Sequence, residues 1–190
     1  MQNSFYSKKE LENLGFKSIG CNVSISKKSS IYGINNISIG DNVRIDDFTI
    51  LSGKINIENN IHIAAYSALY GGTKGIFLKD FSNISSRVTI YAVSDDYSGE
   101  SLTSPMVPEK YKTLDESPVI INKHVIIGST SVILPGVDIG EGCAIGSLSL
   151  VKNSLKPWGI YAGSPVKKVK SRSKKIIELE TKFLAQYNQI

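Results

Sequence analysis

The fold of this chain is decided by residues 121–151, which read INKHVIIGSTSVILPGVDIGEGCAIGSLSLV. An aliphatic residue stands at every sixth position of this stretch, and four blocks upstream keep the same interval. A small or β-branched residue follows most of these anchors four positions later, as Val125 follows Ile121 and Ser131 follows Ile127. The eighteen anchors are Ile19, Ile25, Ile31, Ile39, Ile45, Leu51, Ile57, Ile63, Leu69, Leu78, Ile84, Ile90, Ile121, Ile127, Ile133, Ile139, Ile145 and Val151.

A six-residue repeat of this length predicts a β-solenoid. A helix would need apolar spacings of three and four, and a hairpin meander would need strict alternation interrupted by turns. We expect each repeat to form one flat side, three sides to form a triangular coil, and the anchors to point inward. Six coils stacked at about 4.8 Å would make a prism roughly 25–30 Å tall, in which each coil packs only against its neighbours.

The repeat is interrupted once by a long segment. Between Ile90 and Ile121 the chain skips about 30 residues, whereas the other joints between blocks carry only small insertions. A long excursion from a rigid scaffold is usually a binding or active-site loop. We therefore expect an extruded loop at residues 92–118 and look for function there.

The closing segments carry a family resemblance. Ile127-Gly128-Ser129, Ile133-Leu134-Pro135-Gly136-Val137 and Ala162-Gly163-Ser164-Pro165-Val166-Lys167, together with the repeat and the loop, resemble the left-handed parallel β-helix acyltransferases of the hexapeptide-repeat superfamily. Within it the chain looks most like the maltose, galactoside and nodulation acetyltransferases and their relatives that acetylate sugars of bacterial O-antigens and capsules. The resemblance covers about residues 17–170 and implies a mainly β fold, a left-handed parallel β-helix of about six triangular coils. The left-handed coiling comes from the resemblance alone, because parallel crossovers are generally right-handed.

Both ends of the chain read as helices. Ser7-Lys8-Lys9-Glu10 is a capping-box pattern and Gly15 a stop signal, so a short helix is expected at about 8–14. Residues 173–187 place their apolar members on one helical face, and we expect this helix to cap the open end of the solenoid. The predicted organisation is an N-terminal helical cap at 1–16, the β-helix acyltransferase domain at 17–170 and a C-terminal helix at 171–190.

Composition agrees with one globular domain in the cytoplasm. The chain has 190 residues, of which 41% are hydrophobic and 21% charged. No apolar stretch approaches the 18 or more residues of a membrane span, and the start, Met1 to Tyr6, does not read as a signal peptide. Cys143 is expected to point inward and Cys21 outward, without metal-ligand spacing around either.

The net charge of +5 is partly concentrated near the C-terminus, between Lys167 and Lys175. Nucleic-acid binding is disfavoured, because no aromatic interleaving or recognised binding module accompanies these lysines. The phosphates of coenzyme A are a better match for them. The resemblance implies that coenzyme A lies along the stacked coils, where the matching positions are Ser129, Ser147, Lys152, Asn153, Lys167 and Lys168. The family's usual Gly-Ala-Gly reads Gly146-Ser147-Leu148 here.

The expected catalytic position holds a carboxylate. Asp95 lies five residues after Ile90, where the resemblance implies a catalytic histidine. An ordinary aspartate has a pKa of about 3.9 and is a weak base for a sugar hydroxyl unless burial raises that pKa. Either Asp95 or Asp96 is a tuned base, or another group serves, or the acceptor needs little help.

Only two histidines are available as alternatives. His124 occupies an outward repeat position and reads as a plain surface residue. His62 is the leading histidine candidate, because Tyr66 and Tyr70 nearby would offer a ligand a stacking face. With Tyr97 of the loop, these two tyrosines are the expected substrate-binding residues.

The expected mechanism is direct acyl transfer in a ternary complex, since no serine or cysteine reads as a nucleophile elbow. The resemblance implies acetyl-CoA as donor and a homotrimer whose loop reaches a neighbouring subunit. We expect acetyl transfer to a sugar of bacterial surface polysaccharide, and the sequence leaves open a hydroxyl or an amine as acceptor. A sugar amine, as in a nucleotide-linked amino-dideoxy sugar, tolerates the missing histidine better.

Two other classes are weighed against an acyltransferase. Zinc-dependent carbonic anhydrases of the same fold need three histidine ligands, and this chain has two, so no metal is expected. A non-catalytic scaffold is the other alternative, supported by the missing histidine but opposed by the long loop and the basic C-terminal segment.

Overall fold

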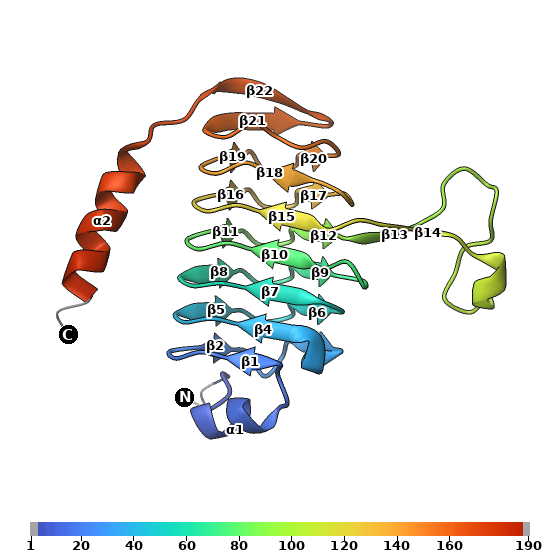
Figure 1. The fold of residues 1–190 in the computed structure, drawn as a ribbon, viewed down its shortest axis with the longest axis horizontal. Coiled ribbons are helices and arrows are strands. Elements are labelled where there is room, and N and C mark those ends of the chain that lie inside the picture. Colours follow the sequence, from blue (N-terminus) through green and yellow to red (C-terminus); the bar gives the residue numbers. More distant parts are fainter. Residues whose placement is uncertain (1–3, 188–190) are drawn as a thin grey trace.

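The structure, a computed structural model, describes residues 4–187 and folds most of them into a three-sided prism (Figure 1). Three sheets form its sides, and all their strands pair in parallel except the last strand of the second sheet, which is antiparallel to its neighbour. Sheet 1 contains β1 (Ser18–Ile19), β4 (Ile37–Ile39), β7 (Ile55–Ile57), β10 (Ile76–Leu78), β15 (Val119–Ile121) and β18 (Asp138–Ile139). Sheet 2 contains β2 (Ser24–Ile25), β5 (Val43–Ile45), β8 (Ile61–Ile63), β11 (Asn83–Ile84), β16 (Ile126–Ile127), β19 (Ala144–Ile145), β21 (Gly159–Gly163) and β22 (Val166–Ser171). Sheet 3 contains β3 (Ser30–Tyr32), β6 (Ile50–Ser52), β9 (Ala68–Tyr70), β12 (Thr89–Tyr91), β17 (Val132–Ile133) and β20 (Leu150–Val151).

Each coil takes one strand from each sheet in turn, so β1, β2 and β3 form the first coil and β18, β19 and β20 the sixth. Leu155, bridged to Ile139, and strand β21 begin a seventh coil. The predicted fold class is therefore confirmed. Sixteen of the eighteen anchors are buried, and only Ile19 and Ile31 of the first coil are partly exposed.

Hydrogen bonds from buried hydroxyls also connect neighbouring coils. Ser67, four residues after an anchor, is fully buried and donates from Oγ to the Ser85 carbonyl at 3.0 Å. Ser131 donates in the same way to the Gly146 carbonyl at 3.1 Å. A short hydroxyl side chain fits inside the corner of a coil and satisfies a backbone oxygen of the next one, which removes the cost of burying either group unpaired.

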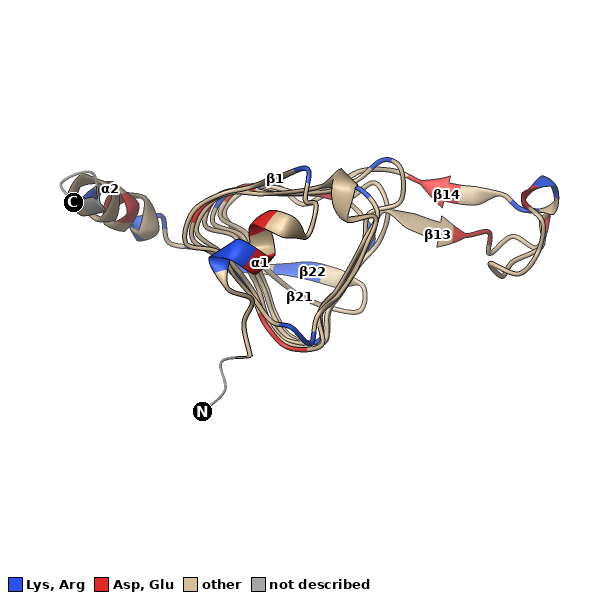
Figure 2. Ribbon diagram, turned by 90° about the horizontal axis from the view of Figure 1, so that it is seen from below, with Lys and Arg blue, Asp and Glu red and all other residues tan. Residues whose placement is uncertain are grey.

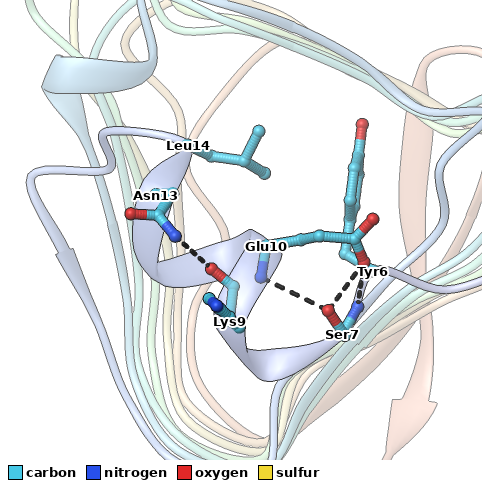
Figure 3. Close-up of a pocket in the computed structure, with 6 residues that line it drawn as sticks. All are labelled: Tyr6, Ser7, Lys9, Glu10, Asn13 and Leu14. Carbon is cyan, nitrogen blue, oxygen red and sulfur yellow. Dashed lines mark hydrogen bonds between the residues drawn. The ribbon is translucent and has the colours of Figure 1, made fainter.

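The N-terminal end of the prism is closed by α1 (Lys8–Asn13), as predicted. Its capping box is formed, since Ser7 Oγ accepts from the Glu10 amide while the Glu10 carboxylate accepts from the Ser7 amide at 2.7 Å. Leu11 is buried, and Tyr6 and Leu14 pack against the first coil. A small hollow of about 370 Å³ lies beside this helix, and Figure 3 shows the residues that line it, Tyr6, Ser7, Lys9, Glu10, Asn13 and Leu14. Residues 1–3 of the expected cap lie outside the described range.

The C-terminal end differs from the expectation. The last coil is covered by the antiparallel hairpin of β21 and β22, whereas α2 (Lys175–Tyr187) turns back along the side of the prism (Figure 1). The prediction that the C-terminal helix caps the open end is therefore wrong. Residues 188–190 of the segment assigned to it lie outside the described range.

The helix α2 packs against the corner between sheets 1 and 2. The Glu180 carboxylate pairs with Lys123 and lies 2.8 Å from His124 Nε2, and Phe183 meets Phe81 edge to face. Burial would raise the pKa of Glu180, but hydrogen bonds from Lys123 and His124 outweigh it and lower that pKa. His124 is only 7% exposed, so the prediction of a plain surface histidine is wrong: its outward position is covered by α2.

The extruded loop appears where the sequence predicts it. After β12 the chain leaves the corner between sheets 3 and 1 as an antiparallel hairpin of β13 (Val93–Asp95) and β14 (Leu114–Glu116), with a 3-10 turn, η2 (Glu109–Tyr111), in its outer part. A second such turn, η1 (Ile34–Asn36), lies in the joint between the first two coils. Figure 2 shows the loop and α2 projecting from opposite sides of the triangle. No helix within residues 4–187 is long and apolar enough to cross a membrane.

Candidate active site

The hairpin and the outer face of sheet 3 enclose a groove of about 1380 Å³. The hairpin supplies acidic side chains and one tyrosine, the third and fourth coils supply two more tyrosines, and the fifth and sixth coils supply aliphatic residues and a lysine. The lining residues are Tyr70, Tyr91, Val93, Ser94, Asp95, Asp96, Tyr97, Pro105, Lys112, Leu114, Asp115, Val132, Leu134, Pro135 and Lys152. Aromatic walls with a few charged groups suit a ligand that has both apolar and polar parts.

Asp95 ends β13 opposite Leu114 and borders this groove. Its side chain is exposed, and within residues 4–187 its carboxylate takes part in no hydrogen bond or ion pair. A carboxylate that nothing in its own chain neutralises is available to a cationic or hydrogen-donating ligand.

Asp96 has a different environment from its neighbour. Its carboxylate accepts hydrogen bonds from the amide and hydroxyl of Ser98, at 2.7 and 2.6 Å, and from the amide and hydroxyl of Ser101, at 2.9 and 3.0 Å. These bonds, those from Ser98 first, hold the pKa of Asp96 far below its usual range. Such a carboxylate is a poor proton acceptor, so Asp96 organises the loop that carries Asp95.

The root of the hairpin is fixed by Glu116, which sequence reasoning missed. Its carboxylate accepts from the Thr73 hydroxyl at 2.6 Å and from the Thr73 amide at 3.1 Å. These bonds lower the pKa of Glu116. Gly72 leaves room for the carboxylate, because a Cβ atom there would lie 2.6 Å from Glu116 Oε1.

Two tyrosines stack at the inner end of the groove. Tyr70 and Tyr91 occupy paired positions on β9 and β12, and their ring centroids lie 5.2 Å apart. Burial, and then the charges of Tyr70 and Tyr97, raise the pKa of Tyr91. Tyr91 was missed by sequence reasoning, although it follows the anchor Ile90 as Tyr70 follows Leu69. Tyr97, two residues after the end of β13, also lines the groove.

His62 lies away from the groove. It stands on β8 in sheet 2, and its Nε2 lies 2.7 Å from Asp46 Oδ2. Burial would raise the pKa of Asp46, but hydrogen bonds from His62 and Arg44 outweigh it and lower that pKa. Within one chain, His62 and Asp95 therefore belong to different sides of the prism.

The residues matched to coenzyme A lie along the last coils. Ser129 and Ser147 occupy the corner between sheets 2 and 3 on successive coils, and Ser129 Oγ lies 3.3 Å from Ser86 Oγ. Lys152 follows β20 and borders the groove, with Asn153 next to it. Lys167 and Lys168 stand exposed on β22. Within residues 4–187, no three His, Cys, Asp or Glu side chains gather as a metal site.

Comparison with known proteins gives full-length matches. No family model matches the chain. It is 49% identical over 177 residues, 92% of either chain, to a dTDP-4-amino-4,6-dideoxy-D-glucose acyltransferase of Escherichia coli. It also superposes with a TM-score of 0.95 and 56% identity on AntD, an N-acyltransferase of Bacillus cereus solved with dTDP-4-amino-4,6-dideoxyglucose and coenzyme A, covering 98% of this chain and 100% of AntD. A further AntD structure, matched at 57% identity and a TM-score of 0.96 over 98% of this chain and 100% of AntD, holds dTDP and 3-hydroxybutyryl-CoA.

Proposed function

Because this chain belongs to the hexapeptide-repeat left-handed β-helix acyltransferases, we propose a specific reaction for it. It transfers an acyl group from a coenzyme A thioester to the amino group of a dTDP-linked 4-amino-4,6-dideoxyglucose. Similarity over almost the whole length of the N-acyltransferase AntD and of an acyltransferase named for an amino sugar supports a nitrogen acceptor over an oxygen acceptor. Acetyl-CoA, expected from the sequence, and 3-hydroxybutyryl-CoA, bound by AntD, are the two donors to compare.

The amine acceptor accounts for the carboxylate at the position where a histidine was expected. The lone pair of a neutral amine attacks the thioester carbonyl carbon without prior removal of a proton. The new C–N bond forms, the C–S bond breaks, and the proton lost by nitrogen ends on the departing thiolate. Positive charge develops on nitrogen during attack, and a negatively charged neighbour stabilises it. We assign that role to Asp95, because its carboxylate is exposed to the groove and unpaired within the described chain.

The AntD structures support this assignment by residue spacing. They include variants at one serine and at one aspartate ten residues further along. In this chain only two serine–aspartate pairs have that spacing, Ser85–Asp95 and Ser86–Asp96. Asp96 is saturated by hydrogen bonds within the loop. The pair Ser85 and Asp95 is therefore our choice for the amine site.

This pair also favours a site shared between copies. Ser85 follows β11 near the corner between sheets 2 and 3, whereas Asp95 stands on the hairpin beyond the far edge of sheet 3. One side of a coil is about six residues of extended chain, roughly 20 Å. One amine reaches both residues only if the hairpin of one copy approaches the corner of another. We therefore propose a homotrimer with sites between its subunits.

The remaining ligand positions follow from this arrangement. Coenzyme A lies along the last coils against Ser129, Ser147, Lys152 and Asn153, and its phosphates meet the basic residues of β22, Lys167 and Lys168. Tyr70 and Tyr97 line the acceptor side of the groove. His62 takes no catalytic part in this proposal, because an amine needs no histidine base and Asp46 holds the imidazole on another side of the prism.

The observation that carries the proposal is the unpaired Asp95 carboxylate, which borders the groove of a chain 56% identical to the N-acyltransferase AntD. The test is turnover of dTDP-4-amino-4,6-dideoxyglucose with each of the two thioesters, followed by release of free thiol and by product mass. The proposal predicts that an acylated nucleotide sugar forms. Coenzyme A binding without acylation of this sugar would reject the acceptor while leaving the donor in place.

A further inference from the structure

A column of two rings and two cations runs along the corner between sheets 2 and 3. Phe48 and Tyr66 stack on successive coils, with ring centroids 4.9 Å apart and planes inclined by 23°. Lys28 Nζ lies 5.5 Å from the Phe48 centroid, and Arg87 Cζ lies 5.6 Å from the Tyr66 centroid. We call these four residues the corner column.

The corner column is exposed, and it lies outside the groove of its own chain. Phe48 is 46% exposed and Tyr66 55% exposed. Neither ring contributes to the buried core of the prism. A ring pair left half in water adds little to stability, so the fold alone does not account for it.

The backbone at this corner directs the side chains of the corner column outward. Phe48, Tyr66 and Arg87 all have left-handed backbone, with φ of 60, 64 and 60°. Bulky side chains rarely adopt this conformation, which asparagine tolerates better. At the corner between sheets 1 and 2, the first three coils place asparagines in the same conformation: Asn22, Asn42 and Asn60. On later coils that corner also carries bulky residues in this conformation, Phe81, His124 and Trp158, and two of these three rings contact α2 or a residue that does.

The two cations of the corner column differ in their ion pairing. Lys28 is paired with Asp47 at 3.0 Å, whereas Arg87 has no ion pair within residues 4–187. Arg87 also lies two residues after Ser85, one of the two residues between which we place the acceptor amine. An unpaired guanidinium beside exposed aromatic rings suits an anion attached to a planar ring.

We propose that the corner column binds the thymidine diphosphate part of the acceptor, an inference that rests on the proposed function. Arg87 meets the diphosphate, and the exposed Tyr66 and Phe48 rings meet the thymine base. The order of these residues along the prism matches the order of the groups in the ligand, in which the sugar is joined to the diphosphate and the diphosphate to the nucleoside. Ser85 and Arg87 stand on the fourth coil, Tyr66 on the third and Phe48 on the second, so these coils span roughly 10 Å along the prism.

Titration calorimetry of the whole protein with dTDP, and separately with coenzyme A, tests this site. Tyr66→Leu should weaken dTDP binding roughly 5- to 150-fold, the range for loss of one base stack, and leave coenzyme A binding within about twofold. Arg87→Gln should weaken dTDP binding and reduce its dependence on salt, whereas Tyr66→Leu should keep that dependence. Tyr32→Leu is the matched control, because Tyr32 is a 60% exposed tyrosine with no ring partner in the described chain.

The possible results distinguish a failure of this inference from a failure of the proposed acyltransferase function. If the unaltered protein binds dTDP and both corner variants bind it equally well, the corner column is not the nucleotide site, although the proposed acceptor stands. If the unaltered protein binds coenzyme A but no dTDP, this result contradicts both the proposed acceptor and the nucleotide site. If Tyr66→Leu changes the sedimentation of the protein and weakens both ligands, the corner column is a contact between copies, which also overturns the inference.

Discussion

Glu116 accepts two hydrogen bonds from Thr73, one from its hydroxyl at 2.6 Å and one from its amide at 3.1 Å. Forty-three residues separate the two in the chain, so the contact ties the root of the hairpin to the third coil of the prism. Glu116 stands opposite Val93, two residues from Asp95. We therefore expect the position of Asp95 to depend on a carboxylate that has no role in the proposed reaction.

Removing this tie should loosen the hairpin without unfolding the prism. Hydrogen bonds to a charged group contribute about 1.5–3 kcal/mol each, and Glu116→Ala loses both. We expect a fall in kcat/KM of about tenfold or more, faster hydrogen exchange in residues 92–118 and little change in Tm. Glu109→Ala, in the outer part of the same loop, is the control. Equal hydrogen exchange in the two variants would show that Glu116 does not hold the hairpin.

Asp95→Asn should lower turnover while leaving the donor bound. The variant keeps the size of the side chain and removes the charge that stabilises the developing ammonium. We expect kcat to fall about 10- to 100-fold and the Kd for coenzyme A to stay within about twofold. Asp115→Asn removes a charge from the facing strand of the same groove and should stay within about threefold of the unaltered enzyme. Unaltered turnover in Asp95→Asn would show that Asp95 does not have the role assigned to it.

The six-residue packing predicts opposite results at two adjacent isoleucines. Ile127 is 0% exposed inside the prism, whereas Ile126, on the outside of the same strand, is 37% exposed. Ile127→Asp should prevent folding, because an unpaired buried charge costs several kcal/mol. Ile126→Asp should lower Tm by no more than a few degrees. Thermal unfolding followed by circular dichroism distinguishes them, and similar losses in both would contradict the inward and outward assignment.

Acid should release α2 from the side of the prism. The pKa of Glu180 lies below its usual 4.5, so its contribution to docking is complete above that pH and is lost as the pH falls through the lower value in the folded protein. The protection of residues 175–187 against hydrogen exchange, relative to the intrinsic exchange rate at each pH, should therefore fall below about pH 4.5. Glu180→Gln should show fast exchange at neutral pH, and Glu178→Gln, on the same helix, should not. Slow exchange in Glu180→Gln would mean that the helix is held by other contacts.

The shared site predicts complementation between copies. The protein should sediment at three times the mass of one chain. Mixed oligomers of Asp95→Asn and Ser85→Ala chains should recover activity that neither variant shows alone, because some interfaces then combine an intact serine with an intact aspartate. A fully active monomer would contradict the shared site.

Much of the prism could be read from the sequence because its repeat is local. The spacing of Ile121, Ile127 and Ile133 predicts which side chains point inward, and all three are buried. The capping box before α1 is equally local, since Ser7 and Glu10 satisfy each other's backbone amides. Both features need only residues that are near in sequence or repeated at a fixed interval.

The incorrect or missed predictions concern contacts between segments that are distant in the sequence. His124 occupies an outward position in the repeat, and only the return of α2, with Glu180 56 residues later, buries it. The tie between Glu116 and Thr73 has no short-range pattern that would reveal it. Tyr91 could have been identified from the sequence, because it follows the anchor Ile90 as Tyr70 follows the anchor Leu69 one coil earlier.

The most direct test of the account is the position of the acyl group in the product. The purified protein is incubated with 3-hydroxybutyryl-CoA or acetyl-CoA and either dTDP-4-amino-4,6-dideoxyglucose or dTDP-6-deoxyglucose, which has a hydroxyl in place of the amine. We predict that only the amino sugar is converted, and that mass spectrometry and NMR show an amide at its 4-position. An ester on the hydroxyl sugar, formed at a comparable rate, would contradict the assignment of an N-acyltransferase.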